Sequence, residues 1–429
     1  MLKRNLKTTL PSAHNVTRTR LDNGMTVLVY ENHNVQSVVV TGSLRAGAIY
    51  EDTALGGLAS MTAGALLRGT ANYTFDNLHT TLEDIGADVD FQTGKFKVGF
   101  NGKSLAEDLS VILDIIADAL RNPTFPAEQV DRLRGERITW MQYQQQDTRW
   151  QADHAFRQTL YPKTHPFHHS TSGTVESLGH IHTDDMAAFH ARQYGPKDMI
   201  LVIVGAVNTS DAIKLAEAAF GDWRNPNQAD RPALPPITPA PQPKHIFMPL
   251  PGKTQSDIVL GVLGPSRYAP DYRAAVLANS ILGQFGMMGR IGDVVREREG
   301  MAYYAYSSLD GGFGPGAWRI SAGVNPANVD RAIELIQQEI QRMIDEPVSK
   351  DDLADNQSYF IGRLPLQLET TDGVANTLHT IETYDLSLDY LVTYQQEIRA
   401  LTVDDLQAAM QKYLDTGAVV VAVAGPETA

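Results

Sequence analysis

The chain has 429 residues, of which 43% are hydrophobic and 20% charged, and its formal net charge at pH 7 is −14. This length favours two domains of roughly 200 residues each. The acidic balance disfavours a general nucleic-acid binder, because neutralising phosphates requires clustered Lys and Arg. The absence of cysteine excludes disulfides, thiolate metal sites and cysteine nucleophiles. No apolar run approaches the roughly 20 residues that a membrane-spanning helix needs.

The first half of the chain predicts helices followed by a closing strand. Ser104–Arg121 carries apolar residues at three- and four-residue steps, which predicts an amphipathic helix. Thr183 opens another helix, and its first turn bears Asp184 and Asp185, which suit the positive end of the helix dipole. The apolar, largely β-branched run Ile200–Val204 then predicts a buried strand that stops at a glycine.

A proline-rich segment divides the chain. Residues 224–244 hold seven prolines and almost no hydrophobic periodicity, which predicts an extended, semi-rigid linker. The sequence therefore predicts an N-terminal domain over residues 1–223 and a C-terminal domain over residues 245–429.

The second half repeats features of the first. Leu401–Gly425 matches Ile181–Gly205 without a gap, and Gln255–Leu260 matches Gln36–Val40 at nearly the same spacing along the chain. Ala327–Asp345 again shows helical periodicity. A sheet-plus-helix unit used twice predicts an α+β fold of two homologous sandwich domains. A stiff linker between duplicated domains further suggests a clam-shell arrangement with a chamber between the halves or between subunits.

Six segments, in order along nearly the whole chain, carry a recognisable pattern: Leu21–Val29, Gly47–Gly57, His165–Phe167, Gly173–Leu178, Tyr194–Gly205 and Val294–Tyr303. Together they resemble the M16 (pitrilysin/insulinase) metallopeptidase family. This family of inverted-motif zinc peptidases includes mitochondrial processing peptidase. The resemblance implies sandwich domains like those of LuxS and the processing peptidase.

The residues that bind zinc in this family are missing. A helix written H-x-x-E-H supplies two histidine ligands and a general base. Counting back from Gly69–Thr70, which matches the end of that helix, places Ser60 and Gly64 at the histidine positions and Ala63 at the glutamate. The third ligand position falls on Met141. The resemblance therefore implies a degenerate motif, no zinc in this chain and no activity of the chain alone.

Histidines elsewhere offer an alternative metal site. One interpretation is an improvised site in the segment that carries these side chains. The other, which we favour, is a polar surface loop with solvated imidazoles, since a loop rich in Ser, Thr and Gly gives ligands little support. The histidines are His165, His168, His169, His180 and His182.

The second half keeps the family's Arg/Tyr pair as Arg296 and Tyr303. Gly300 between them predicts a helix end, which would put Arg296 in the last helical turn and Tyr303 at the start of a strand. The resemblance implies that this pair donates hydrogen bonds to the substrate carbonyl and to the developing oxyanion. The alternative is a surface arginine and a tyrosine that packs at an interface.

A glycine-rich segment precedes the pair. Gly283, Gly286 and Gly289 resemble a flexible lip that would let an extended peptide pass, although Phe285 is bulkier than the family's loop suggests. Bulky side chains here would instead give substrate or partner a compliant apolar contact. A simple helix–helix turn is the competing interpretation.

These features together predict a zinc-less subunit of a heterodimeric M16B peptidase. A partner subunit carrying H-x-x-E-H would bring zinc, and this chain would hold unfolded peptide substrate and stabilise the oxyanion. The alternative is a structural core-type subunit, or a peptide-binding module with no catalytic role. No nucleic-acid or membrane partner is expected.

Two features of the sequence bear on the cellular compartment. No apolar segment follows the basic N-terminus, so no signal peptide is predicted in the sequence as written. The cysteine-free chain and its similarity to bacterial two-domain enzymes favour the bacterial periplasm, with the cytoplasm as the alternative.

Overall fold

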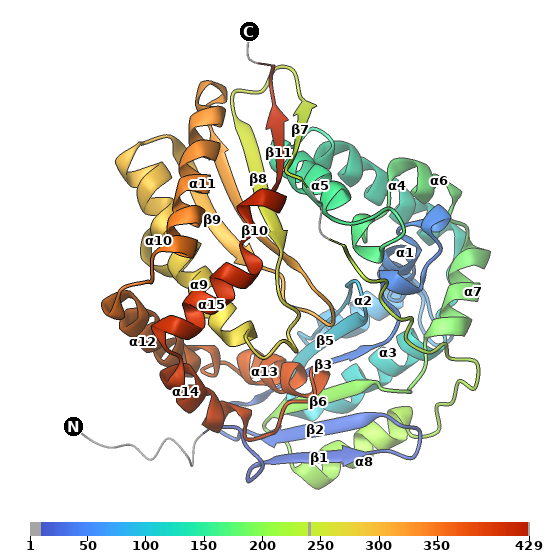
Figure 1. The fold of residues 1–429 in the computed structure, drawn as a ribbon. Coiled ribbons are helices and arrows are strands. Elements are labelled where there is room, and N and C mark those ends of the chain that lie inside the picture. Colours follow the sequence, from blue (N-terminus) through green and yellow to red (C-terminus); the bar gives the residue numbers. More distant parts are fainter. Residues whose placement is uncertain (1–9, 239–241, 428–429) are drawn as a thin grey trace. The chain divides into compact units, whose positions relative to one another are not determined.

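The computed structural model describes residues 10–238 and 242–427; the ends of the chain and linker residues 239–241 lie outside the described part. The chain forms two compact units, each built on one mixed β-sheet (Figure 1). Neither unit is continuous in sequence. Unit 1 holds the described residues up to Thr139, Ser170–Ala233 and Arg363–Gln395, and unit 2 holds Trp140–His169, Leu234–Gly362 and the described residues from Gln396 onward.

The sheet of unit 1 has the strand order β1-β2-β6-β3-β5-β4. Its central strand β6 (Ile200–Gly205) is parallel to β2 (Thr26–Glu31) and antiparallel to β3 (Ser37–Leu44). All other neighbouring strands are antiparallel. These strands are β1 (Val16–Arg20), β4 (Asp88–Thr93) and β5 (Val98–Leu105).

The sheet of unit 2 has the order β7-β11-β8-β10-β9. Here β11 (Val420–Gly425) is parallel to β7 (Lys244–Pro249) and antiparallel to β8 (Ser256–Leu263). Strands β10 (Ala317–Val324) and β9 (Ala302–Leu309) complete it as an antiparallel pair.

The two sheets have the same order once β1 is set aside. Strands β2, β6, β3, β5 and β4 correspond in turn to β7, β11, β8, β10 and β9, with the same parallel and antiparallel neighbours. The matched segments of the sequence repeat fall on corresponding strands, since β6 matches β11 and β3 matches β8. The duplication and the α+β fold class predicted from the sequence are confirmed.

Helices account for most of the remaining described residues (Figure 1). Helix α7 begins at Thr183, as predicted, and its counterpart α15 is capped by Thr402. The α-helices are α1 (Leu58–Ala65), α2 (Phe75–Asp84), α3 (Leu109–Arg121), α4 (Ala127–Gln144), α5 (Thr148–Leu160), α6 (Val175–His180), α7 (Thr183–Gln193), α8 (Thr209–Phe220), α9 (Tyr272–Gly283), α10 (Phe285–Gly292), α11 (Val329–Asp345), α12 (Lys350–Gln367), α13 (Thr371–Thr383), α14 (Tyr390–Ala400) and α15 (Val403–Tyr413).

The helix predicted over Ser104–Arg121 starts later than expected. Strand β5 continues to Leu105, and α3 begins at Leu109. Along β5, buried residues alternate with more exposed ones up to its end, which is the period of a half-buried strand. The pattern of apolar residues around Ser104 therefore fits the two-residue period of a strand as well as the period of a helix.

Both faces of the unit 1 sheet are covered. One face packs against the large core that includes α1, α3, α7 and α8. The other face presents Leu28, Val39 and Val202 to Val374 and Leu378 of α13, which comes from the C-terminal half of the chain. Unit 1 therefore completes its packing with a helix from beyond the linker.

Unit 2 uses a helix from the other half in the same way. Helix α5, from the N-terminal half, packs on β8 and β11 of the unit 2 sheet. At its start, Thr148 donates a hydrogen bond to the carboxylate of Asp257, which is buried at the beginning of β8. Each compact unit thus takes in a helical segment from the other half of the sequence. The predicted linker at residues 224–244 separates the two halves of the sequence repeat, and its role as a domain boundary stays a prediction.

Candidate functional site

Helix α1 lies at the position predicted for the zinc helix. Glu51 accepts hydrogen bonds from the backbone nitrogens of Gly57, at 3.1 Å, and Ala59, at 2.8 Å. These bonds satisfy N–H groups at the start of the helix, which have no partner within it. Burial raises the pKa of the Glu51 carboxyl to about 7, although both backbone hydrogen bonds favour the charged form.

The degenerate ligand positions do not fit zinc. Ser60 is half-buried, while Ala63 and Met141 are buried apolar side chains. A Cβ atom added to Gly64 would lie 3.2 Å from Nη2 of Arg137, so a guanidinium cation flanks the face from which a ligand would project. Within residues 10–238 and 242–427, no three His, Asp or Glu side chains form a possible metal-binding group. Zinc needs a set of nitrogen, oxygen or sulfur ligands that these residues do not supply.

An edge strand runs beside α1. Thr93 at the end of β4 donates a hydrogen bond to the backbone oxygen of Ala59 at 3.2 Å. Among the described strands, β4 pairs with β5 alone, so its outer edge has no strand partner. An exposed sheet edge of this kind accepts an extended peptide as an added strand.

Arg296 occupies the predicted helix end. It lies in the π-helix Asp293–Arg298, and its backbone oxygen accepts a hydrogen bond from Gly300 at 3.1 Å. Gly300 has a φ of 60°, which is the left-handed conformation expected where a helix ends at glycine. The Arg296 side chain is one-third exposed, and its Nε lies 3.6 Å from the carboxylate of Glu297.

Tyr303 projects from an irregularity at the edge of the unit 2 sheet. On β10, Gly323 pairs with Tyr304 and Val324 pairs with Ala302, so Tyr303 is the extra residue of a β-bulge. Its side chain is 86% exposed. A bulge re-aims a side chain, and this one directs a large aromatic residue into solvent rather than into the core.

The glycine-rich segment forms a tight turn, the α9–α10 turn, that runs from the end of α9 into the first part of α10, where residues 286–289 have non-helical backbone angles. A Cβ atom on Gly283 would lie 2.3 Å from the backbone nitrogen of Ser307. Gly289 has a φ of 63°, and its added Cβ would lie 2.6 Å from the nitrogen of Gly283. Gly286 also has a positive φ, of 61°, but nothing lies within 4 Å of its added Cβ. Close packing therefore requires glycine at two of the three positions, Gly283 and Gly289. This is what the interpretation as a helix–helix turn expects.

This turn covers the edge of β9. The sulfur of Met288 accepts a hydrogen bond from the backbone nitrogen of Ala305 at 3.4 Å, and Gln284 donates to the backbone oxygen of Ser307 at 3.3 Å. The ring of Phe285 packs edge-on against Tyr359 at 5.3 Å between centroids. Polar groups at this sheet edge are thereby occupied, in contrast to the outer edge of β4.

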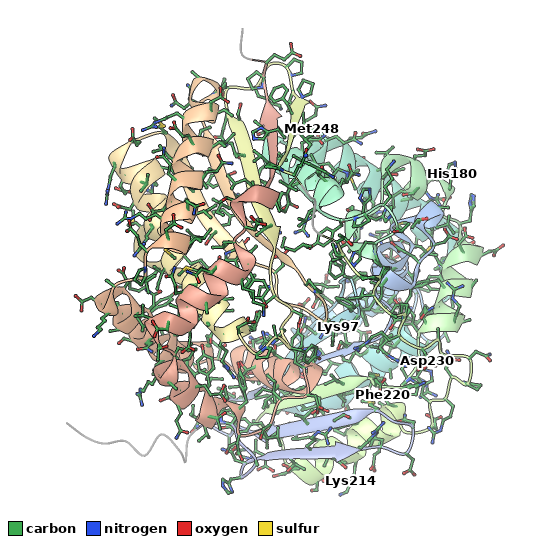
Figure 2. The ribbon with its side chains drawn as sticks, in the orientation of Figure 1. Lys97, His180, Lys214, Phe220, Asp230 and Met248 are labelled. Atoms are coloured by element: carbon green, nitrogen blue, oxygen red, sulfur yellow. The ribbon has the colours of Figure 1, made fainter. Side chains whose placement is uncertain are left out.

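The histidine segment is held together by its own hydrogen bonds. The Nδ1 atom of buried His165 accepts from the backbone nitrogen of Phe167 at 3.1 Å. His168 bonds to the backbone oxygen of Tyr161 and His169 to that of Lys163, both at 2.9 Å. The remaining pair, His180 and His182, is exposed, and Figure 2 shows His180 at the surface. The prediction of solvated imidazoles is therefore wrong for His165 and His168, which are buried and hydrogen-bonded to the backbone of their own segment.

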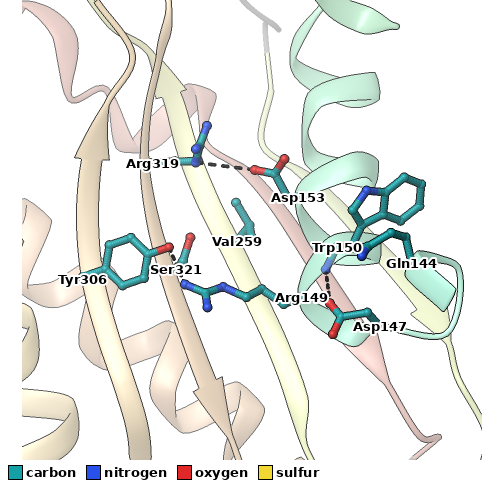
Figure 3. A pocket seen from close by; sticks show the side chains of 9 residues that line it. All are labelled: Gln144, Asp147, Arg149, Trp150, Asp153, Val259, Tyr306, Arg319 and Ser321. Atoms are coloured by element: carbon teal, nitrogen blue, oxygen red, sulfur yellow. Dashed lines mark hydrogen bonds and ion pairs between the residues drawn. The ribbon is translucent and has the colours of Figure 1, made fainter. Parts of the chain in front are cut away.

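Unit 2 contains a cavity of ≈300 Å³ that sequence reasoning missed (Figure 3). Val259, Ser321 and Tyr306 lie opposite one another on β8, β10 and β9 and contribute to its lining. Trp150 of α5 also lines it. Helix α5 and these strands lie far apart in the chain, so the spacing of residues within any short segment does not predict the cavity.

The charged residues that line this cavity are two arginines and two aspartates, Arg149, Arg319, Asp147 and Asp153. Arg149 donates to the hydroxyl of Tyr306 at 2.8 Å. Arg319 lies 2.8 Å from the carboxylate of Asp310 and 3.5 Å from that of Asp153. The cavity therefore offers a polar but charge-balanced surface.

Two family profiles match this chain. The insulinase (peptidase family M16) profile matches residues 26–172, and the peptidase M16 inactive-domain profile matches residues 180–359. With the duplicated fold and the degenerate zinc helix, these matches define the class: the chain belongs to peptidase family M16.

Individual relatives agree with this assignment. An uncharacterized zinc protease of Streptomyces coelicolor is 23% identical over 93% of this chain and 87% of its own. The mitochondrial-processing peptidase subunit beta of Bos taurus is 22% identical over 96% of this chain and 85% of its own. A peptidase M16 inactive-domain structure from Pseudomonas fluorescens has a TM-score of 0.88 and 25% identity, and covers 97% of this chain and 98% of its own. A protease structure from Helicobacter pylori has a TM-score of 0.85 at 19% identity, over 97% and 100% of the two chains.

Proposed function

We propose that this chain is the zinc-less subunit of a heterodimeric M16 peptidase and supplies Arg296 and Tyr303 to the zinc site of a partner subunit. The observation that carries the proposal is the contrast between two places in the chain. Among the described residues, helix α1 has no group that fits a metal, whereas Tyr303 remains 86% exposed on a bulge. An exposed aromatic side chain with a hydroxyl at its tip contributes little to the core, so its value lies in what it contacts outside the chain.

The chemistry of the pair suits an oxyanion. Zinc held by the partner would supply the activated water for attack on a peptide carbonyl. The Tyr303 hydroxyl and the Arg296 guanidinium would donate hydrogen bonds to the carbonyl oxygen and to the negative charge that develops there. Arginine remains charged at all relevant pH values, so its donors persist throughout the reaction.

An unfolded peptide would bind as an added strand. The outer edge of β4 supports this role, because its backbone groups have no strand partner among the described residues and it runs beside α1. The edge of β9 is already covered by the α9–α10 turn. We also propose that Phe285 and the glycines Gly283, Gly286 and Gly289 contact peptide or partner at this turn.

The test is reconstitution with an M16 subunit that contains H-x-x-E-H. Arg296→Ala and Tyr303→Phe should each lower the rate of peptide cleavage by about 10²–10³, the usual cost of one oxyanion donor. Tyr268→Phe is a matched control, because Tyr268 is another exposed tyrosine of unit 2. Cleavage rates that stay unchanged in both variants would remove the catalytic role.

A subunit that only holds peptide or supports an assembly is the alternative. In that case both variants would retain full cleavage while β4-edge substitutions would still weaken peptide binding. The bacterial periplasm is the compartment we propose for either role. No helix within the described ranges has the length and apolarity that crossing a membrane requires.

A further inference from the structure

Basic side chains gather at one end of the unit 1 sheet. Leu44 and Val98 form the last pair between β3 and β5, so Arg45 directly follows β3 and Lys97 directly precedes β5 at the same end of the sheet. Strand β6 begins at the same end, because its first residue Ile200 pairs near the end of β3. Figure 2 labels Lys97 at this position.

Arg45 is buried without a full set of partners. Only 7% of the residue is exposed, and its Nη1 lies 3.4 Å from the carboxylate of Asp198. Its Nε and Nη2 atoms are buried and find no hydrogen-bond partner among the described residues. Buried donors are normally satisfied, because removing them from water without a replacement bond costs free energy.

Lys97 is a second poorly compensated cation. Its Nζ donates to the Thr383 hydroxyl at 2.9 Å, and no carboxylate of the described residues pairs with it. Burial, and then the charge of Arg231, lower the pKa of Lys97 to about 8. His379 offers no negative charge in return, since burial and the charge of Lys97 lower the pKa of this imidazole to about 3.

The Tyr50 hydroxyl is affected by the charges of Arg45 and Arg231. Burial raises the pKa of the Tyr50 hydroxyl, and the charges of Arg45 and Arg231 partly oppose that rise. The charge of Arg231 acts on both Tyr50 and Lys97. Of the acids nearby, Asp230 already pairs with Lys197 at 2.5 Å.

The placement of Lys97 and Arg45 is not explained by folding. Keeping Lys97 charged where it is half-buried without a carboxylate partner among the described residues disfavours the folded state, although a chain with a net charge of −14 contains many carboxylates. Groups that break the usual rules of burial tend to mark functional positions.

We propose that this end of the unit 1 sheet binds a carboxylate, held by the ammonium of Lys97, with the buried guanidinium of Arg45 behind it. Charge-assisted hydrogen bonds from these groups complement a carboxylate. The strong negative charge of the whole chain disfavours multiply charged anions, which favours a singly charged ligand. A peptide C-terminus and a small organic acid share this chemistry, and the site does not depend on Arg296, Tyr303 or a partner.

Calorimetric titration of the full chain with four probes tests the proposal. The probes are a hexapeptide with a free C-terminal carboxylate, the same peptide amidated at its C-terminus, acetate and inorganic phosphate. Binding of the acid peptide but not the amide identifies a peptide end as the ligand. Equal binding of acetate identifies a small acid. Binding of phosphate alone, or of none of the probes, overturns the proposal.

Variants separate binding from folding. Lys97→Met should weaken carboxylate binding by about 10- to 100-fold, as expected for a lost charge-assisted contact, and should raise the melting temperature of the unliganded protein. Lys103→Met is the control, since Lys103 is an exposed lysine on β5 that pairs with Asp372 and should leave binding unchanged. If Lys97→Met binds the probe as tightly as the parent chain, the site is wrong. Arg45→Gln should weaken binding too, with melting curves to establish that it folds.

Discussion

Glu51 shows how a single residue combines a structural bond with an unfavourable charge. Its carboxylate accepts two backbone hydrogen bonds at the start of α1, but burial still raises its pKa from 4.5 to about 7. The folded state therefore holds the proton more tightly than the unfolded state. The stability that Glu51 contributes is fully present below about pH 4.5 and is lost as the pH rises to about 7.

Replacing this carboxyl should flatten the pH dependence of folding. We expect Glu51→Gln to remove a loss of up to about 3 kcal/mol in the free energy of unfolding between pH 4.5 and 7, the equivalent of the pKa shift. Urea unfolding at several pH values measures it. Glu83→Gln, at an exposed position on α2, should keep the parent's slope. If Glu51→Gln left the pH dependence of the unfolding free energy unchanged, Glu51 would not be the group responsible for this loss.

At the scale of elements, the α9–α10 turn depends on glycines for two different reasons. Gly286 requires only its positive φ, since nothing lies within 4 Å of an added Cβ. Gly289 combines a positive φ with a backbone contact that an added Cβ would bring to 2.6 Å. A turn built this closely against β9 is a packed connection, which limits how far it opens as a lip.

The two glycines should therefore respond differently to alanine. Gly286→Ala should cost about 1–3 kcal/mol of unfolding free energy, because a φ of 61° with a ψ of −123° is a backbone conformation that non-glycine residues rarely adopt. Gly289→Ala should cost more than that, because the turn must also move away from Gly283. Denaturant unfolding of both variants measures the difference. Equal losses would mean that the turn is not packed as described.

At the scale of the whole molecule, the sequence halves and the compact units differ. Helix α13 covers apolar residues of the unit 1 sheet, and α5 covers the unit 2 sheet, although each helix belongs to the other half of the chain. Neither half of the sequence contains everything that its sheet needs for burial. The two halves must therefore fold together.

A fragment of residues 1–223 should not be stable alone. Without α13 it would expose Leu28, Val39 and Val202, which are buried in the full chain, so we expect aggregation or a partly unfolded state. Co-expression with residues 224–429 should restore a soluble complex. Size-exclusion chromatography and circular dichroism report both results. A monomeric, cooperatively folding 1–223 fragment would contradict the exchange of helices.

Much of the fold was readable from local patterns. The strands β6 and β11, their correspondence in the two halves and the start of α7 follow from short runs of β-branched residues and from Thr and Asp at a helix start. The helix end at Gly300 was readable for the same reason, because only glycine adopts a positive φ easily. The boundary between β5 and α3 was missed, since apolar residues there fit both periods.

The sequence by itself determined the duplicated α+β plan, the absence of His, Asp and Glu from α1 and the local setting of Arg296 and Tyr303. Each can be recognised within a short segment of the chain or by comparing two such segments. Only the tertiary structure decided which sheet α5 and α13 cover, that Arg137 lies beside Gly64, and that Arg45 and Lys97 lie at the same end of a sheet. These arrangements depend on contacts between distant segments, where burial and charge act through space and leave no periodic trace along the chain.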